Sequence, residues 1–299
     1  MIPLFDLHCD TLLNLYHNKY SIKASPLHIS LDKTKIFSPY NQVLAIWSDC
    51  RLSPKEAYNQ YRNVIDYAKN QEIYFVKSFN ELLTKRFILA IEGGKIAEGD
   101  LNRLDEFKKD GVKIITLCWS DTNDICGAWN TSLPLTEFGR SFVKRCFDLS
   151  IIPDVSHTSV EATKEVINLA KKNNKTIIAS HSNSYTICNH NRNLRDDDFV
   201  SIKYLDGLVG ISMAPQHLSI DTTVTIDHII KHINHYLSLG GENTVCLGCD
   251  FDGVSSLPEG INDISDLENL YIKMQEEFGE EITNKIFYYN AENFFKKNF

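Results

Sequence analysis

The segment IPLFDLHCD, residues 2–10, joins an apolar run to a cluster of ionisable side chains. Its first half has the composition of a buried β-strand, and its second half carries His8 and Asp10. Side chains two positions apart on a strand lie on the same face. We therefore expect His8 and Asp10 to point together at one site, with Asp6 one step deeper in the fold and Cys9 facing away.

Seven further apolar runs follow, each separated from the next by a turn and a longer, amphipathic segment. They are QVLAIW from Gln42, FILAIEGG from Phe87, KIITLCW from Lys113, IIPDVSH from Ile151, TIIASHS from Thr176, GLVGISM from Gly207 and TVCLGCDFDG from Thr244. Near-continuous apolar runs are typical of parallel strands that are buried on both faces. Another run, IYFVKSF from Ile73, is expected to pair outside this set.

The segments between these runs carry signals for helix starts. In SPKE, Ser53 is the predicted N-cap, Pro54 fits the first helical position, and Glu56 completes a capping box. In TSVEATKEVINLA, Thr158 is the predicted N-cap with Glu161 as its partner. Both segments are therefore expected to form helices.

Eight strands that alternate with helices predict an α/β protein, a (β/α)8 TIM barrel that takes in residues 1–299 as a single domain. A length of 299 residues and a hydrophobic share of 43% allow a core of that size. An open, doubly wound sheet is the alternative. It is disfavoured because no glycine-rich phosphate loop follows the first run.

Composition limits the partners of the protein and the compartment in which it works. The formal net charge of -8 argues against nucleic acid and anionic lipid as partners. We find no apolar run of about 18 residues and no signal-peptide pattern in residues 1–10. Eight cysteines are too few for a disulfide scaffold, so we expect a cytoplasmic protein. Cys246 and Cys249, three apart on a strand, should face opposite sides rather than share a metal.

Polar side chains follow five of the runs at the carboxyl end, where the chemistry of a TIM barrel lies. They are His8 and Asp10 after the first run, Glu92 after the third, His157 after the fifth, His181 after the sixth, and Asp250 and Asp252 after the eighth. Asp252 is expected to be structural.

The histidines and carboxylates among these residues offer more ligands than the three protein ligands of a single catalytic zinc. We therefore expect two divalent metal ions about 3.5–4 Å apart, which share a hydroxide and polarise a carbonyl. The expected ligands are His8, Asp10 and Glu92 for one ion and Glu92, His157 and His181 for the other, so that Glu92 is the bridge.

The chain resembles the membrane (renal) dipeptidase family, the M19 metallopeptidases. The matching stretches are DLHCD, AIEGG, DVSHTS, ASHSNSYTICNHNRNLRDDD, LGCDFDGV, PEGINDISD and NAENFF, in family order from near Met1 to near Phe299. The resemblance implies a metallo-dependent hydrolase-like barrel, two zinc ions on the five ligands named above, and hydrolysis of dipeptides that can carry a D-residue at the C-terminal position. It also suggests a homodimer.

The resemblance assigns roles to three further residues. Asp250 would accept the proton of the attacking water and pass it to the leaving amine. Arg192 would bind the substrate carboxylate with its planar guanidinium, unless it forms an ion pair with Asp196 or Asp197. Trp119 is a departure from the mammalian-type members of the family, which have a histidine there that contacts the substrate, whereas some bacterial branches also carry tryptophan. An indole donates one hydrogen bond but does not titrate.

The departure at Trp119 bears on the substrate rather than on the metal site, and His190 and His217 are candidates to compensate for it. Three other functions stay open: an amidohydrolase-like enzyme for another small amide or lactone, a metal-dependent phosphoesterase, and a non-catalytic metal- or peptide-binding relative. The H-x-D pattern of residues 8–10 and the glutamate bridge favour the dipeptidase. A scarcity of basic residues near the ligands disfavours the phosphoesterase.

Overall fold

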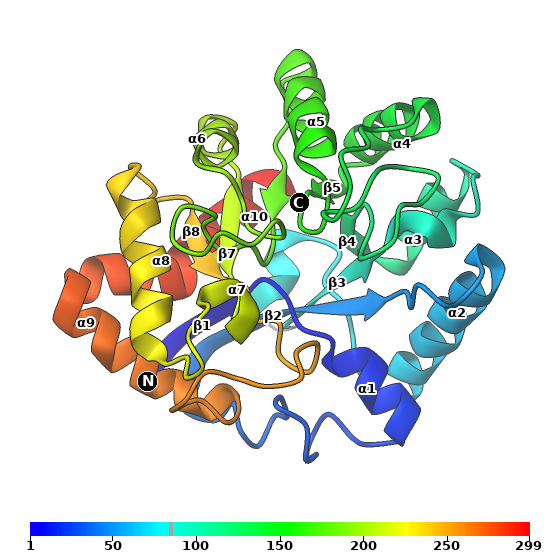
Figure 1. Cartoon of the computed structure of the whole chain (residues 1–299). Coiled ribbons are helices and arrows are strands. Elements are labelled where there is room, and N and C mark those ends of the chain that lie inside the picture. The colour runs from blue at the N-terminus through cyan, green and yellow to red at the C-terminus, as the bar shows by residue number, and fades with distance from the viewer. Residues whose placement is uncertain (84–85) are drawn as a thin grey trace.

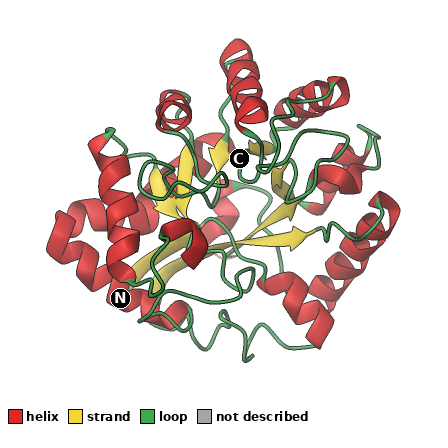
Figure 2. Ribbon diagram, viewed as in Figure 1, coloured by secondary structure: helices red, strands yellow, loops and turns green. Residues whose placement is uncertain are grey.

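The computed structural model describes residues 1–83 and 86–299 and forms a closed barrel of parallel strands that follow one another in chain order. Figure 1 and Figure 2 show the strands at the centre and the helices around them. The strands are β1 (Ile2–Asp6), β2 (Phe37–Trp47), β3 (Phe87–Glu92), β4 (Val112–Thr116), β5 (Ile152–Asp154), β6 (Ile178–Ala179), β7 (Leu208–Ile211) and β8 (Val245–Leu247). The predicted (β/α)8 barrel is confirmed, and the doubly wound sheet is excluded.

The helices lie mainly between consecutive strands. They are α1 (Thr11–Asn18), α2 (Pro54–Asn70), α3 (Arg103–Asp110), α4 (Glu137–Asp148), α5 (Val160–Asn173), α6 (Asp196–Tyr204), α7 (Pro215–Leu218), α8 (Ile226–Ser238), α9 (Leu267–Asn284) and α10 (Asn290–Asn298), with short helices η1 (Phe79–Leu83), η2 (Gly94–Ala97), η3 (Ile264–Asp266) and η4 (Lys285–Tyr289). Within the described ranges, none of the helices has both the length and the apolar character needed to cross a bilayer.

The predicted helix starts are right in one case and displaced in the other. The capping box at Ser53 is present at the start of α2. Helix α5 is capped by Ser159, whose hydroxyl accepts a hydrogen bond from the N–H of Ala162. The prediction of Thr158 was therefore wrong by one position, because the Thr158 hydroxyl donates instead to the carbonyl of Val155, 2.8 Å away.

The first strand ends sooner than the alternation of its side chains suggests. Strand β1 stops at Asp6, and the backbone bends at Leu7. Leu7 packs inside the barrel, whereas Cys9 packs in the layer between strands and outer helices, away from the interior as predicted. His8 and Asp10 therefore point towards a common site after a bend in the chain, not as neighbours on one continuous strand.

Strand β2 begins at Phe37, before the run that was predicted from Gln42. Its pairing with β1 shifts register between Ile2 and Leu4, and Pro39 lies opposite this irregularity. Proline has no N–H to donate, so within sheets it is tolerated at bulges and edges. The sequence prediction therefore missed the first part of β2, because a proline within an apolar run argues against a strand.

Two expectations about pairing and facing are confirmed. The run from Ile73 stays outside the barrel and makes an isolated bridge between Phe75 and Phe87. Cys246 of β8 packs inside the barrel and Cys249, which follows β8, packs in the outer layer, so the two thiols face opposite sides of the barrel wall.

The interior of the barrel is filled at the amino ends of the strands by the C-terminal helices η4 and α10. Figure 1 shows α10 behind the strands, opposite the loops that cover the carboxyl ends. The ring of Phe295 stacks on Phe5 with centroids 5.2 Å apart, and Tyr288 packs on the same ring at 5.9 Å. Apolar packing therefore closes the amino end, and the carboxyl end is left for polar side chains.

A buried lysine at this closed end gives a testable pH dependence of stability. Lys113 of β4 is 2% exposed and donates hydrogen bonds to the carbonyls of Ser150 and Asn298. Burial, aided by the charge of Lys108, lowers the pKa of Lys113 from 10.5 to about 7. Between these values the unfolded chain holds a proton that the folded protein has lost, so this group makes stability rise with pH.

We expect Lys113→Met to flatten the rise in the free energy of unfolding between pH 7 and 10.5, by a few kcal/mol at about 1.4 kcal/mol per pKa unit. The stability difference in favour of the variant should be largest below pH 7, because Lys113 of the wild type is then protonated in both the folded and the unfolded state and its charge is buried on folding. Urea titrations across this range measure the slope. Lys109→Met, at an exposed position, is the matched control. Equal slopes for Lys113→Met and wild type would contradict the prediction.

Candidate metal centre

Glu92 stands at the last position of β3, with its carboxylate at the carboxyl end of the barrel. It pairs in register with Trp47 on one side and Thr116 on the other, and it is 2% exposed. Gly93 follows with a φ of 98°, a left-handed conformation that favours glycine, and its N–H donates to the carbonyl of Thr116 at 3.0 Å. The chain therefore turns away directly after Glu92 and leaves the carboxylate fixed.

One oxygen of Glu92 meets two histidines. Its Oε1 lies 3.0 Å from Nε2 of His157 and 3.4 Å from Nε2 of His181, and the two Nε2 atoms are 2.9 Å apart. His157 has a φ of 70°, a left-handed backbone conformation that is unfavourable for a non-glycine residue, and it adopts this conformation where its imidazole meets Glu92 and His181. The three atoms form one of the groups in the described chain that could hold a metal ion.

The other oxygen of Glu92 faces the residues that follow β1. Its Oε2 lies 3.5 Å from Nε2 of His8, which is 3.9 Å from Oδ2 of Asp10. The N–H of Asp10 donates to the carbonyl of Phe251 at 2.9 Å, so this segment is tied to the residues after β8. The structure thus brings together all five predicted ligands, with Glu92 between the two halves.

Asp250 lies beside the same cluster. Its Oδ1 is 3.8 Å from Nε2 of His8, its N–H donates to the His8 carbonyl at 3.0 Å, and its φ is 62°. Burial raises the pKa of Asp250 to about 7, with Glu92 adding to the rise and His8 opposing it. His8, His181 and Asp250 form a further group with ligand spacing, so Asp250 can hold either a proton or a metal ion.

A chain of hydroxyl groups orients His181. The Ser180 hydroxyl donates to Oδ2 of Asp154 at 2.5 Å, so its oxygen accepts from Nδ1 of His181 at 2.7 Å. Thr116 donates to the same Asp154 oxygen at 2.6 Å. With its proton on Nδ1, His181 presents the lone pair of Nε2 to the cluster, as a metal ligand requires.

The sequence analysis missed this chain and three glycines that make room for the site. A Cβ atom on Gly210 or Gly248 would overlap the carbonyl oxygen of Ser180. A Cβ on Gly253 would overlap the carboxylates of Asp10 and Asp250. The available signal was an ionisable Asp154 inside the apolar run IIPDVSH, and the glycines gave none, because close approach between distant strands has no local pattern.

The chemistry of the cluster fits divalent cations. Nε2 of His8 and Oδ1 of Asp10 are buried and have no hydrogen-bond partner among the described residues. Burial raises the pKa of Glu92 to about 8 and also raises that of Asp10, where the charge of Glu92 adds to the effect. Burial lowers the pKa of His157 and of His181, which favours the neutral, metal-binding imidazole. Divalent cations would supply positive charge beside Glu92 and Asp10 and so stabilise their ionised forms.

Arg192 lies next to the cluster, 5% exposed. Its guanidinium donates to Oγ of Ser182 at 3.0 Å and to the carbonyl of His181 at 2.9 Å, and its Nε is buried without a partner. Within residues 1–83 and 86–299, no carboxylate lies within ion-pair distance of Arg192, while Asp196 pairs with His235. The alternative in which Arg192 pairs with Asp196 or Asp197 is therefore wrong, and among the described residues the guanidinium bonds only to neutral oxygens.

Trp119 follows β4 and is partly exposed at the same end. Its ring packs edge-on against Trp47, with centroids 4.9 Å apart, and lies 6.1 Å from the ring of His157. Lys95 is buried nearby and donates to the carbonyl of Asp49 at 2.7 Å and to Asp121 at 3.4 Å, which links the loops after β2, β3 and β4. Trp119 thus lies at the carboxyl end of the barrel, next to the ring of His157.

Two other aspartates support the site from outside it. Asp6 accepts hydrogen bonds from the N–H of Cys249 at 2.7 Å and from Gln42 at 2.8 Å, so it is buried as expected but does not contact a ligand imidazole. Asp252 accepts hydrogen bonds from the Thr11 hydroxyl at 2.5 Å and from the backbone N–H of His28 at 2.7 Å, which agrees with a structural role.

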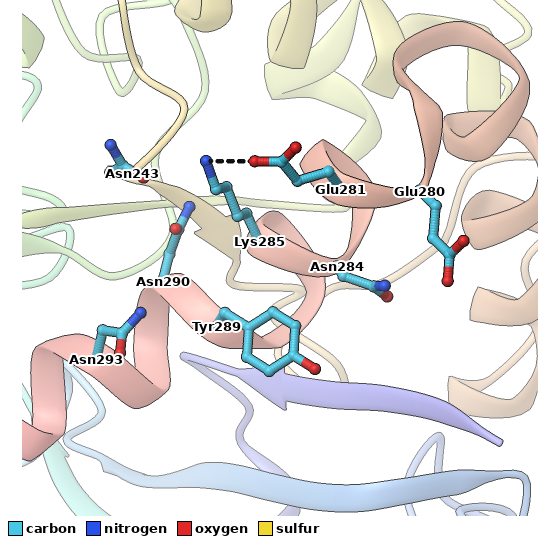
Figure 3. Close-up of a pocket in the computed structure, with 8 residues that line it drawn as sticks. All are labelled: Asn243, Glu280, Glu281, Asn284, Lys285, Tyr289, Asn290 and Asn293. Atoms are coloured by element: carbon cyan, nitrogen blue, oxygen red, sulfur yellow. Dashed lines mark ion pairs between the residues drawn. The ribbon is translucent and has the colours of Figure 1, made fainter.

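A hollow of about 640 Å³ lies at the other end of the barrel (Figure 3). Asn290, on its wall, donates to the carbonyl of Val245, the first residue of β8, so the hollow is on the amino side. Its lining includes an ion pair between Lys285 and Glu281 and contributes no side chain to the metal-ligand groups of the described chain. We therefore assign the functional site to the carboxyl end.

The closed barrel, with candidate metal ligands gathered at the carboxyl ends of its strands, has a metallo-dependent hydrolase-like fold. The family model described as membrane dipeptidase (peptidase family M19) matches residues 1–297. The chain belongs to this family, and the resemblance found in the sequence is confirmed.

Comparison with individual proteins gives the same fold. An uncharacterized dipeptidase of Schizosaccharomyces pombe is 28% identical over an alignment of 244 residues, and the match covers 76% of this chain and 59% of that protein. The chain thus spans less than two thirds of the length of this relative. A metallo peptidase from Rhodobacter sphaeroides, liganded with a phosphinate mimic of the dipeptide L-Ala-D-Ala, superposes with a TM-score of 0.91 at 22% identity and covers 100% of this chain and 99% of its own. A structure named dipeptidase AC, also a metallo peptidase, gives 0.90 at 23% identity over 99% and 98%.

Proposed function

We propose that this protein is a metal-dependent dipeptidase that hydrolyses the peptide bond of free dipeptides. The observation that carries the proposal is the position of Glu92, whose two oxygens each face a separate group of ligands, beside the unpaired guanidinium of Arg192. Family membership and the dipeptide mimic in the Rhodobacter sphaeroides structure support a dipeptide substrate, including one with a D-residue at the C-terminal position.

The five ligands would hold two divalent ions, His8, Asp10 and Glu92 on one side and Glu92, His157 and His181 on the other. Nitrogen and oxygen ligands of this kind suit zinc, which we propose as the native metal. Bound divalent ions supply Lewis acidity, which polarises a carbonyl and makes water a better nucleophile at neutral pH. Zinc content of the purified protein, measured by elemental analysis, tests the assignment.

Asp250 is the proposed proton carrier. Its carboxylate lies within 3.8 Å of the ligand His8 and is buried, so it can take a proton from water at the cluster and hold it at Oδ1 or Oδ2 for the leaving amine. Arg192 would orient the substrate through its C-terminal carboxylate. Trp119 would contact the substrate near the cluster, where its indole N–H can donate but cannot exchange a proton.

We expect Arg192→Lys to raise KM about 10–100-fold with a smaller effect on kcat, because a charge-assisted hydrogen bond is worth about 1.5–3 kcal/mol. The effect should vanish on a dipeptide amide, which lacks the carboxylate that Arg192 binds. Arg195→Lys, on the same loop, is the matched control. A loss that is equal on the free dipeptide and on its amide would remove Arg192 from carboxylate recognition.

A hydrolysis screen separates this proposal from the alternatives. L-L and L-D dipeptides, tripeptides, an N-acyl amino acid and a lactone are offered with Zn²⁺ or Mn²⁺. Cleavage of free dipeptides alone supports the proposal, whereas cleavage of the lactone or the acyl compound alone favours an amidohydrolase-like enzyme. No cleavage of any compound would favour a non-catalytic metal- or peptide-binding protein.

We further propose that the protein works in the cytoplasm and forms a homodimer. All eight cysteines are free, which is typical of a reducing compartment and supports the first part. Only the family resemblance supports the dimer. A measurement of molar mass in solution, such as sedimentation equilibrium, would test it.

A further inference from the structure

Three aromatic rings from three different loops lie in a row beside the metal centre. Trp129 follows β4, His190 follows β6, and His217 lies in α7 after β7. The centroids of Trp129 and His190 are 5.3 Å apart, and those of His190 and His217 are 4.7 Å apart. All three side chains are partly exposed. We call Trp129, His190 and His217 the ring row. Its spacing is that of packed aromatic side chains.

Trp129 and His190 are fixed by hydrogen bonds to the segments that carry the site. The N–H of Trp129 donates to the carbonyl of His157 at 2.8 Å. The N–H of Arg192 donates to Nδ1 of His190 at 3.1 Å, so a neutral His190 carries its proton on Nε2. These two bonds tie the backbone of Trp129 to that of the candidate ligand His157 and the ring of His190 to the backbone of Arg192.

His217 is held through its own backbone. Asn193, the neighbour of Arg192, donates to the His217 carbonyl at 2.8 Å. In addition, His232 joins the two loops concerned, because it accepts from the N–H of Ser184 at 3.0 Å and its Nε2 lies 2.9 Å from the carbonyl of Leu218. The loop with Arg192 and the helix with His217 therefore form one connected support.

The two imidazoles of the ring row are neutral at physiological pH. Burial, aided by the charge of Arg192, lowers the pKa of His217 to about 2 and lowers that of His190 as well. They therefore add no positive charge to that of Arg192. Their faces are uncharged aromatic surfaces, which pack best against flat, apolar groups.

We infer that the ring row forms a subsite for the side chain of the substrate's C-terminal residue and favours aromatic side chains there. This rests on the proposed function, in which Arg192 holds the carboxylate of that residue. The Cβ of an amino acid is two bonds from its carboxylate carbon, so the side chain must lie close to the guanidinium. The ring row is an aromatic surface next to Arg192: its His190 accepts the backbone N–H of Arg192, and the Arg192 charge acts on both His190 and His217.

The test compares kcat/KM for L-Ala-L-Phe, L-Ala-L-Ala and L-Phe-L-Ala in the metal-loaded enzyme. We expect L-Ala-L-Phe to be preferred over L-Ala-L-Ala about tenfold, which corresponds to about 1.4 kcal/mol. L-Phe-L-Ala should show no such gain. Trp129→Ala and His217→Ala should bring the preference for L-Ala-L-Phe close to one, and His217→Phe should restore it, because the flat surface returns. Tyr204→Ala, an exposed ring on α6, is the control and should keep the preference.

Each outcome is decisive. A wild type without the preference, or both alanine variants with it intact, would overturn the ring row as a subsite while leaving dipeptide cleavage in place. Cleavage of none of the dipeptides would instead overturn the proposed function and the subsite with it. The ratio between substrates is the readout because a general loss of folded protein lowers all rates together and leaves the ratio unchanged.

Discussion

Asp250→Asn is expected to lower kcat by about 10²–10⁴-fold while the bound metal is retained, since this is the usual contribution of a proton-transferring group. Asparagine has nearly the same shape as aspartate but cannot accept a proton under these conditions. The backbone hydrogen bond from residue 250 to the carbonyl of His8 does not depend on the side chain and should remain. Elemental analysis and steady-state kinetics of the same preparation measure both quantities.

The same variant decides between two roles for Asp250. If Asp250 is a ligand with His8 and His181, the asparagine variant should lose metal along with activity. If it carries the proton, metal content stays and only turnover falls. Asp252→Asn is the matched control, because Asp252 is in the same segment but bonds to Thr11, and it should affect kcat far less. Unchanged kcat in Asp250→Asn would remove Asp250 from the mechanism.

Glu92→Gln is expected to lower metal affinity more than about 100-fold. Activity should fall along with the bound metal. Loss of a residue that merely supports a metal ligand already costs about 10–100-fold, and Glu92 faces both groups of ligands at once. Isothermal titration with Zn²⁺ and residual kcat at saturating metal measure the effect. Glu98→Gln is the control, because Glu98 bonds to Arg103 away from the cluster.

Removal of the metal should reverse the order of stability in this pair. In the metal-free protein, burial raises the pKa of Glu92 from 4.5 to about 8. The folded protein then binds a proton that the unfolded chain has lost between these values, so stability falls as pH rises through this window. Glu92→Gln has no carboxylate to ionise, so its stability should not fall in this way. In chelator near pH 8 it should therefore be more stable than the wild type. With metal present, the wild type should be the more stable one. The same order of stability in both conditions would contradict a metal centre at Glu92.

Much of the site could be predicted because its signals are local. His8, Glu92, His157 and His181 are costly polar residues at the ends of apolar runs, and the barrel collects such ends on one side. The capping box at Ser53 was equally local, since it joins residues three apart. The displaced cap at Ser159 shows the limit of such signals, because Thr158 and Ser159 are both good caps and a contact with Val155 decided between them.

The supporting residues could not be predicted, because their partners are distant in sequence. The bonds from Thr116 and Ser180 to Asp154 connect β4, β5 and the residue that follows β6, and only strand register brings them together. The ring row likewise joins Trp129, His190 and His217 from three loops. Nothing near any one of these residues indicates that another aromatic ring will lie 5 Å away.

The sequence alone determined the alternation of apolar runs with helices and the chemical type of the side chain at each carboxyl end. These follow from burial of apolar surface and from the cost of an ionisable group in an apolar strand, both of which act residue by residue. The tertiary structure alone decided that Glu92 would turn one oxygen to each group of ligands, that Arg192 would keep a guanidinium without a carboxylate, and that Asp154 would orient His181. These depend on barrel closure and strand register, which fix distances between segments that the chain separates by as many as 247 positions.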